Sequence, residues 1–561
     1  MSKPAESLKN SGPSRGEAAF EVIWLLLLFF LFAGSPPPDA GESCYVQKAK
    51  HFWDPQWCGR DLFLASADAH AVLYALIGWL TKYFSLEATA WLCRVPIWLF
   101  MAIGWQRMQQ AVAPGKLLAI LSGGIFLVLS RWFPMAREVA VCGVESKAIA
   151  FGCVFFLVAA IQNKRWNEAW VWVGVGSAFH VVVGAWSAII LFGVWACSRG
   201  ERPPFLKMLP GLAIGGAISL LALVPALLLR RGADAATIAE ADRIYVYERL
   251  RHHLVFHSFE HLAIGGDPLI ERFAFLCVVM GVLMWFTWKV ETLRPAYRVA
   301  LGALGISLVG IAIDQTLVYR LDVSAPILRL YWYRMSDVCV PMAVSLAAVA
   351  GLQLLEQRGS KWAQVGWMVA LLVALVGVLE VPAARQRRRI PDAILQPRPT
   401  EDSRKSPWEM AIADSAETGE KPKKVVTISQ YFEEWKTMCY WAKDHSRQDA
   451  LFLTPRTQQT FKWYAERAEV ATWKDIPQDA RSIVEWYNRL EALYPSDPPI
   501  QDLIDHSDEE LVRLARLYKA EYIVLDHSRR PRKVKLPQIY PEFGAAPGLF
   551  AIYRVPPESA K

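Results

Sequence analysis

The sequence predicts an α-helical polytopic membrane protein, with about eleven transmembrane helices and a small C-terminal α/β soluble domain. Of the 561 residues, 54% are hydrophobic and only 20% are charged, whereas soluble domains are about one quarter charged. The charge is also unevenly divided. From Ala383 to the end, 56 of 179 residues are charged, against 58 of the 382 before them. This division excludes a purely soluble enzyme, a disordered chain and a disulfide-stapled miniprotein.

The net charge and the aromatic content indicate which partners to expect. The formal charge is +8, but no basic block resembles a nucleic-acid-binding stripe, so nucleic acid is not an expected partner. The 24 tryptophans fit a protein with many helix ends at a membrane interface, where indole rings gather. Membrane lipids are therefore the expected surroundings.

The first helix is expected over 18–34, with its N-terminus in the cytoplasm. The polar start and the apolar run "VIWLLLLFFLFAG" are also typical of a signal peptide. We interpret the helix as retained, because the "SPPP" that follows is a poor context for cleavage. A long loop over 35–88 then begins, expected outside the cytoplasm.

Ten further apolar runs predict the remaining helices, at roughly 89–106, 117–131, 148–162, 168–181, 184–198, 208–229, 271–289, 299–317, 332–355 and 362–381. Several are shorter than the ~20 residues that span a bilayer comfortably. Basic residues fall in alternate short loops: Arg107 with Lys116, Lys164 with Arg165, Arg199 with Arg202 and Lys207, Arg294 with Arg298, and Arg358 with Lys361. The positive-inside rule then places the 35–88 loop and the C-terminal tail outside the cytoplasm.

One segment argues for the other orientation of the tail. The basic sequence "ARQRRR" (384–389) directly follows the last helix, on the side assigned as external. If the stretch 168–198 crossed the membrane once, every later loop would invert and the tail would be cytoplasmic. We expect two crossings, and keep the single crossing as the alternative.

The domain organisation follows from composition. Residues 1–382 are the transmembrane domain, 383–425 a linker rich in proline and charge, and 426–561 a soluble domain that we expect to be extracytoplasmic. Helices are expected near 431–445, 478–493 and 508–519, and strands at "ALFLTP", "EYIVLD" and "GLFAIYRV". This alternation is typical of a small α/β domain. Its sequence contains no glycine-rich phosphate loop and no metal-ligand spacing.

The 35–88 loop carries the most informative pattern. It contains the acids Asp54, Asp61 and Asp68 among aromatic residues, and "AVLYALIGWLTKYF" has the spacing of a helix lying in the interface. Cys44 and Cys58 lie in the same loop, and a disulfide between them is possible in an oxidising compartment.

The layout resembles the membrane-embedded glycosyltransferases of the GT-C superfamily, such as protein O-mannosyltransferases and the aminoarabinose transferase of lipid A. In those families a first helix leads to a long external loop with catalytic acids. A His-x-x-x-Tyr helix and a helix flanked by arginines follow, as His70, Tyr74, Arg94 and Arg107 do here. The adjacent acid pair common in that superfamily is absent, since Asp54 and Asp61 are seven residues apart. The chain also resembles uncharacterised bacterial multi-pass proteins with an "HFWDP…D" loop.

The resemblance implies transfer of a sugar from a polyprenyl-phosphate donor. A carboxylate must take the proton of the acceptor, and we expect Asp54, or else Asp61, to be this catalytic base. Each has a structural alternative: Asp54 begins an Asp-Pro turn, and Asp61 is an N-cap before "LFLA". Asp68 is expected to cap the helix that starts at His70, itself a candidate substrate contact.

Further polar residues are candidates for binding the sugar or the lipid phosphate. Glu145 and Lys147 stand at an outer helix start, where the alternative is simple solvation. His180 stands at a break between two apolar segments, a depth at which polar groups tend to be functional. Its alternative is a hydrogen bond to the backbone.

The loop 230–270 and the start of the apolar run 332–355 add cations. Arg249 and Arg251 belong to "ERLRHHLVFHSFEH", a cationic platform for phosphate or an interfacial helix. Its histidines lack an H-E-x-x-H companion, so no metal site is expected there, and the need for a divalent metal ion is left open. Arg334 either binds a lipid phosphate or pairs with Asp337 one helical turn away.

The predicted function is a glycosyltransferase of the cytoplasmic (inner) membrane, with an envelope lipid, glycan or protein as acceptor. One alternative is a transporter or flippase of a lipid-linked molecule. Asp314 is the main acid within a predicted helix, and the others cluster at outer ends, which disfavours a proton-coupled carrier. The other is a non-catalytic membrane scaffold. No cofactor is implied by any motif.

Overall fold

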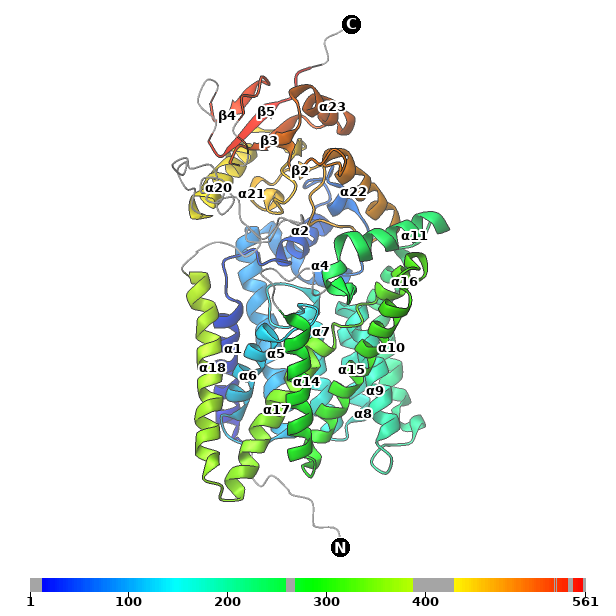
Figure 1. The fold of residues 1–561 in the computed structure, drawn as a ribbon, viewed down its shortest axis with the longest axis vertical. Helices are drawn as coiled ribbons and strands as arrows, with labels where there is room; N and C mark the ends of the chain where they lie inside the picture. The colour runs from blue at the N-terminus through cyan, green and yellow to red at the C-terminus, as the bar shows by residue number, and fades with distance from the viewer. Residues whose placement is uncertain are drawn as a thin grey trace.

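The computed structural model describes residues 13–258, 268–386, 428–528, 530, 532–542 and 548–557. A helical bundle occupies one end of the molecule, and a smaller domain with a β-sheet sits on the other (Figure 1). We call the end of the bundle under this domain the domain end, and the other end the opposite end. The linker predicted over 383–425 lies outside the described residues beyond 386.

A helix covers each of the predicted apolar runs within the described ranges. These helices are α1 (Arg15–Ala33), α5 (Leu86–Val112), α6 (Leu118–Trp132), α7 (Ser146–Gln162), α8 (Trp166–Phe179), α9 (Val181–Cys197), α10 (Leu209–Leu228), α14 (Leu269–Phe286), α15 (Arg294–Thr316), α17 (Ser336–Gln357) and α18 (Trp362–Gln386). Among the described residues, six helical segments are long and apolar enough to cross a membrane: α1, α5, α10, α14, α15 and α17, with the short η2 (Phe205–Met208) and η4 (Glu291–Leu293) extending α10 and α15. The expected count of eleven spans is not confirmed, because helices such as α6, α7 and α9 have only 15, 17 and 17 residues.

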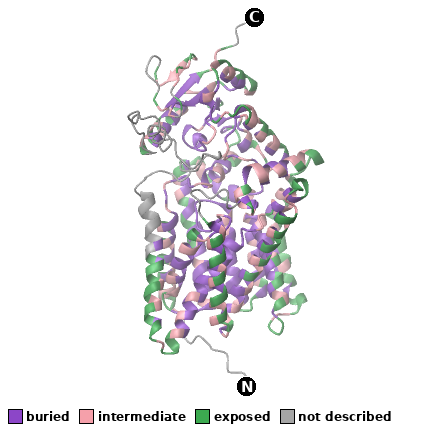
Figure 2. Ribbon diagram, viewed as in Figure 1, coloured by how far each residue is buried: buried purple, intermediate pink, exposed green. Residues whose placement is uncertain are grey.

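The bundle is held together by apolar packing around α17. In the most apolar 18-residue window of α17, 83% of the residues are buried, against 17% in α10 at the edge. Figure 2 shows the same contrast between a buried interior and exposed outer helix faces. The helices α8 and α10 approach closely at Gly174 and Gly215, where a Cβ on Gly174 would lie 2.2 Å from the Gly215 carbonyl oxygen. Small residues of this kind let helix backbones meet in apolar surroundings.

Short helices cover the domain end of the bundle. They are α2 (Glu42–Trp53), α3 (Leu62–Ala65), α4 (Ala71–Ile77) with η1 (Gly78–Lys82), α11 (Ala235–Arg243), the π-helix η3 (Ile244–Arg249), α12 (Arg251–Leu254) and α16 (Leu321–Leu328). The first four come from the long loop after α1. The helix expected over "AVLYALIGWLTKYF" is present as α4 and η1.

The C-terminal domain contains a mixed five-stranded sheet. Its elements are α20 (Ile428–His445), β1 (Leu451–Leu453), α21 (Phe461–Ala465), β2 (Ala468–Glu469), α22 (Ala480–Leu493), η6 (Leu503–Asp505), α23 (Asp508–Tyr518), β3 (Tyr522–Asp526), β4 (Gln538–Tyr540) and β5 (Phe550–Arg554). The strand order is β2-β1-β3-β5-β4, with β1 parallel to β2 and β3, and β5 antiparallel to β3 and β4. The central strands are buried, as expected for short apolar runs covered by helices. The predicted small α/β domain is therefore present.

Polar contacts hold this domain against the bundle. Arg249 Nε donates to the Trp473 carbonyl at 2.7 Å, and Arg329 Nη2 donates to the Gln478 carbonyl at 2.8 Å. The Ala480 amide donates to the Leu229 carbonyl at 3.1 Å. Side chains and backbone from η3, α10 and α16 thus reach the segment before α22.

A fully buried ion pair fixes the first loop to the bundle. Arg94 on α5 donates to both carboxylate oxygens of Glu42, at 2.8 and 2.6 Å, and both residues are 0% exposed. Arg94 also donates to the Ser35 carbonyl, and Glu42 accepts the Val144 amide. Because removing one partner leaves an uncompensated buried charge, this pair is essential to the native arrangement.

Replacing Arg94 with methionine is expected to lower the free energy of unfolding by about 3–5 kcal/mol. Denaturant unfolding of the purified protein in detergent measures the loss. The matched control is Arg60→Met, which breaks the ion pair between Arg60 and Glu521. The two side chains are 34% and 48% exposed, so this substitution is expected to cost about 0–1 kcal/mol. Equal losses in the two variants would contradict the structural role of Arg94.

Candidate active site at the domain end of the bundle

A buried group of polar side chains lies where the bundle meets the C-terminal domain. We call it the polar layer; its members are Tyr45, His70, Glu138, Glu145, Lys147, His180 and Arg334. They come from α2, the turn before α4, the segment between α6 and α7, the start of α7, the α8–α9 break and the segment before α17. Five of them were candidate binding residues: His70, Glu145, Lys147, His180 and Arg334. The fold brings these five together.

A continuous chain of charge contacts forms the centre of the polar layer. Arg334 Nε donates to Glu138 Oε2 at 2.6 Å, and Lys147 Nζ lies 2.9 Å from Glu138 Oε1. The same ammonium lies 3.2 Å from Glu145 Oε2. Two cations and two carboxylates therefore balance in charge at a site that is largely shielded from water.

His180 is the breaking point between α8 and α9, as the apolar pattern predicts. Its Nε2 lies 2.8 Å from Arg334 Nη1. A guanidinium can only donate, so Nε2 faces a donor, and Nδ1 on the other side of the ring faces the Val183 amide at 3.3 Å as the cap of α9. The ring centroid of His70 lies 5.4 Å from that of His180 and 5.2 Å from that of Tyr45. The polar layer thus combines charges with a row of rings.

The two carboxylates of the polar layer differ in their freedom to react. Burial would raise the pKa of Glu138, but the charges of Arg334 and Lys147 lower it to about 2. Glu138 is therefore a fixed counter-ion. Lys147 Nζ lies 3.2 Å from Glu145 Oε2, farther than from Glu138 Oε1 at 2.9 Å. Glu145 is therefore the carboxylate that Lys147 holds less closely.

Asp68 positions His70 rather than reacting itself. It accepts the His70 amide at 2.8 Å and the Tyr74 hydroxyl at 2.9 Å. It is not the expected helix cap, because the N-cap of α4 is His70 itself. Burial opposes its charge, yet the ammonium of Lys48, 3.5 Å away, lowers the pKa of Asp68. The His-x-x-x-Tyr pair of the sequence is thus joined through one carboxylate.

The two acids expected to supply the catalytic base lie outside the polar layer. Asp54 is exposed in the turn that ends α2, the arrangement that its Asp-Pro sequence also indicates. Asp61 is 2% exposed and accepts the Leu64 amide at 3.0 Å, so it is the N-cap of α3. The role of base remains a prediction for both residues.

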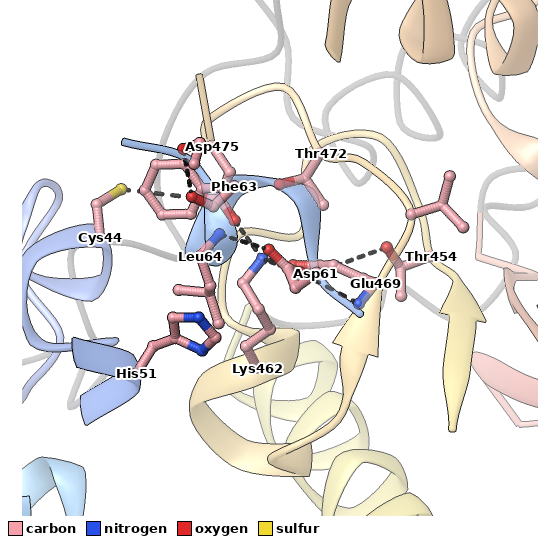
Figure 3. Close-up of polar contacts among 12 residues, drawn as sticks. Cys44, His51, Asp61, Phe63, Leu64, Thr454, Lys462, Glu469, Thr472 and Asp475 are labelled. Carbon is pink, nitrogen blue, oxygen red and sulfur yellow. Dashed lines mark hydrogen bonds and ion pairs between the residues drawn. The ribbon is translucent and has the colours of Figure 1, made fainter. Parts of the chain in front are cut away.

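Asp61 belongs to a second buried group, the Lys462 cluster, which consists of Lys462, Asp61, Glu469 and Asp475. Lys462 Nζ lies 3.1 Å from Asp61, 2.6 Å from Glu469 and 2.5 Å from Asp475. Figure 3 shows the ammonium pointing into the three carboxylates, with Asp61 coming from the first loop and the others from the C-terminal domain. Each of the four residues is at most 2% exposed. This cluster anchors the loop to the domain.

The Lys462 cluster holds more negative than positive charge. Burial raises the pKa of Glu469 to about 7, and the charges of Asp475 and Asp61 act in the same direction, against that of Lys462. When Glu469 binds a proton it becomes neutral, and the excess of negative charge in the Lys462 cluster decreases.

The remaining sequence candidates have other roles. Arg249 is buried against Trp473 of the C-terminal domain, and Arg251 is exposed on α12. Of the two alternatives left open for Arg334, pairing with Asp337 is not found: Asp337 accepts the amides of 135, 136 and 138, and Arg334 donates to Glu138. His257 Nδ1 bonds Asp314 at 3.0 Å, whereas His261 lies outside the described residues.

The disulfide between Cys44 and Cys58 is not formed. Both are free cysteines: the Cys44 thiol points at Asp475, 3.6 Å away, and Cys58 is buried in a turn at φ 50°. Among the described residues, no group of three or more His, Cys, Asp and Glu has the arrangement of a metal site.

Five members of the two groups were missed by sequence reasoning: Tyr45, Glu138, Lys462, Glu469 and Asp475. Glu138 stands seven residues before Glu145 in the same short segment, and this shared segment was the available signal. Lys462 stands in a polar-aromatic stretch of the tail. Nothing in the sequence around it indicates that it lies close to Asp61 in the fold.

Comparisons with known proteins find a family match in the C-terminal domain. Residues 433–493 match the family described as Domain of unknown function (DUF6798), a segment that contains Lys462, Glu469 and Asp475. No curated protein matches the chain.

Two similar solved structures are both archaeal. One is the oligosaccharyltransferase of Archaeoglobus fulgidus in complex with zinc and sulfate, at 9% identity and a TM-score of 0.43, covering 91% of this chain and 68% of that one. The other is oligosaccharyltransferase AglB from the same organism with an inhibitory peptide and a dolichol-phosphate. It is 10% identical, with a TM-score of 0.41, covering 91% of this chain and 69% of that one.

The raised pKa of Glu469 predicts how stability depends on pH. The folded state binds a proton that the unfolded state releases near its ordinary pKa of 4.5. Stability is therefore expected to fall as pH rises from about 4.5 to about 7, by at most about 1.4 kcal/mol per pH unit. Denaturant unfolding at several pH values measures this slope. Glu469→Gln should flatten this slope. The control Glu485→Gln, on the solvent face of α22, should leave the slope as it is in the wild type. An unchanged slope in Glu469→Gln would contradict the raised pKa of Glu469.

Proposed function

We propose that this protein is a membrane-embedded glycosyltransferase that moves a sugar from a polyprenyl-phosphate donor to an envelope lipid, glycan or protein. The observation that supports this best is the polar layer itself. It places Lys147, Arg334 and the less occupied carboxylate of Glu145 together at one end of an apolar bundle. There an anionic head group can enter while its polyprenyl chain stays in the lipid.

The proposed binding step exchanges one anion for another. A phosphate oxygen takes the place of Glu145 beside Lys147, and Arg334 supplies the second cation. Charge-assisted contacts of this kind are strong where water is excluded. His180 beside Arg334 and the rings of His70 and Tyr45 supply neutral polar groups and flat faces for a sugar.

The proposed transfer step uses the freed Glu145 carboxylate as base. An acceptor hydroxyl or amine attacks the anomeric carbon from the side opposite the phosphate, which inverts that carbon. The bond from the anomeric carbon to the phosphate oxygen breaks, and its electron pair leaves with the polyprenyl phosphate. Glu145 takes the proton of the acceptor, while Lys147 and Arg334 stabilise the leaving phosphate.

Glu145→Gln is expected to lower the rate of transfer by about 10²–10⁴-fold, the usual contribution of a general base, with the fold intact. The assay follows release of polyprenyl phosphate from polyprenyl-phosphate-linked hexose and pentose donors, with cell-envelope extract as acceptor. Asp54→Asn is the control, since Asp54 is exposed and outside the polar layer. Loss of transfer in Asp54→Asn alone would return the base to Asp54, and unchanged transfer in both variants would exclude both residues as the base. Absence of transfer by the wild-type protein would instead favour a non-catalytic scaffold.

The proposal also requires the polar layer to face the extracytoplasmic side of the inner membrane. Reporter fusions after His70 and after Lys561 should both report an external position, as the positive-inside pattern predicts. A tail fusion that reports from the cytoplasm would mean that 168–198 crosses once. A cytoplasmic His70 fusion would contradict the glycosyltransferase proposal.

A further inference from the structure

A cavity of about 240 Å³ opens at the opposite end of the bundle, away from the polar layer. It lies between the end of α7, the starts of α8 and α15, and the segment after α9. Since α7 begins beside Glu145 in the polar layer and ends at Gln162 in this cavity, its whole length separates the two sites. We call this space the basal cavity.

Cations and neutral donors line the basal cavity. Lys164, Arg294 and Arg298 contribute three positive charges, and Glu201 with Glu291 contributes two negative ones. Arg294 is shared between these two acids, at 3.7 and 3.1 Å. The lining therefore has a net positive charge. Lys164 and Arg298 are the two cations that remain once Arg294 is assigned to the two acids.

Arg298 is held in place with donors left over. Its Nη1 donates to Ser198 Oγ at 2.7 Å, and Ser198 is 2% exposed. The guanidinium has five N–H donors in a planar fork, which matches the oxygens of a phosphate. Ser198 thus orients the fork at the wall of the cavity.

Two further side chains of the lining carry unsatisfied polar atoms. The Trp166 indole Nε1 and the Thr292 hydroxyl Oγ1 are buried, and neither has a hydrogen-bond partner among the described residues. Trp166 is 5% exposed. Both atoms are closed off from solvent, so they lie in the wall behind the surface of the cavity.

The surroundings of the cavity fit a membrane surface. The helices α8 and α15 both start there, so the positive ends of their dipoles face the cavity. Trp288 is 66% exposed close to the start of η4, as tryptophans are at membrane interfaces. The loops with Lys164 and Arg298 are those that the positive-inside pattern places in the cytoplasm, where the leaflet carries anionic lipids.

We propose that the basal cavity binds a phosphate-bearing anion, through Arg298 and Lys164 as cationic contacts. The anion is either the head group of an anionic phospholipid or a water-soluble phosphate. Neither choice depends on the glycosyltransferase proposal, because the basal cavity and the polar layer share no residue.

The test uses the full-length protein, delipidated in an uncharged detergent. Short-chain phosphatidylglycerol and inorganic phosphate are each titrated by calorimetry, and then against one another. We expect saturable binding, with competition between the two probes. Lys164→Gln and Arg298→Gln are each expected to weaken binding about fivefold, the usual contribution of one cation near a lipid phosphate.

The matched control is Arg165→Gln, which removes the same charge from the neighbouring residue. Arg165 is 59% exposed, pairs with Glu168 at 2.9 Å and is not part of the lining. It should bind both probes as the wild type does. Lys164 is exposed, so Lys164→Gln keeps the test valid if Arg298→Gln fails to fold.

The source of the phosphate follows from the two affinities. Phosphatidylglycerol binding at least tenfold more tightly than inorganic phosphate would identify a lipid head group. Equal affinities would identify a water-soluble phosphate. Absence of saturable binding by either probe, or equal weakening in Arg165→Gln and Lys164→Gln, would overturn the proposal.

Discussion

The ion cluster around Lys462 is the interaction on which the arrangement of the molecule depends. One ammonium is shared by a carboxylate of the first loop and two of the C-terminal domain, all nearly inaccessible to water. Ions buried in this way are costly unless each is compensated, so the cluster holds only when loop and domain are joined. The same loop carries Tyr45, Asp68 and His70, whose positions at the polar layer therefore depend on the domain above them.

The two buried charge groups differ in the balance of their charges. This difference suits the Lys462 cluster to a structural role and the polar layer to a chemical one. In the Lys462 cluster a single cation is surrounded by three carboxylates, and the backbone amides of Leu64 and Glu469 occupy Asp61 further. In the polar layer cations and carboxylates are equal in number, and Glu145 keeps one long contact. A ligand can replace that contact without leaving a bare charge behind. We therefore expect reactivity in the polar layer, where the charges balance but the contact between Lys147 and Glu145 is long.

Local features of the chain were predictable, and contacts between distant segments were not. The apolar runs indicated the helices, "GSAFHVVVGAW" indicated the break at His180, and Asp61 before "LFLA" indicated an N-cap. Each of these follows from neighbours within one or two turns. The partners of Asp61, Arg334 and Cys44 depend on tertiary packing instead, so Glu138 replaced Asp337 as the partner of Arg334. Helix number was the other weak point, because runs of 15 to 17 residues satisfy an apolar pattern without the length of a span.

The position of Lys462 in the chain has a consequence for biosynthesis. Chains emerge from the ribosome with the N-terminus first, so Asp61 is inserted with the loop about 400 residues before its cation is made. Until the C-terminal domain has folded, the loop lacks the ammonium that its carboxylate requires. A nascent or truncated chain therefore presents an unanchored loop to proteases and chaperones, whereas a finished chain does not. The segment 433–493, in which the family match falls, supplies the Lys462 ammonium, so this anchoring of the loop waits until that segment has been made and folded.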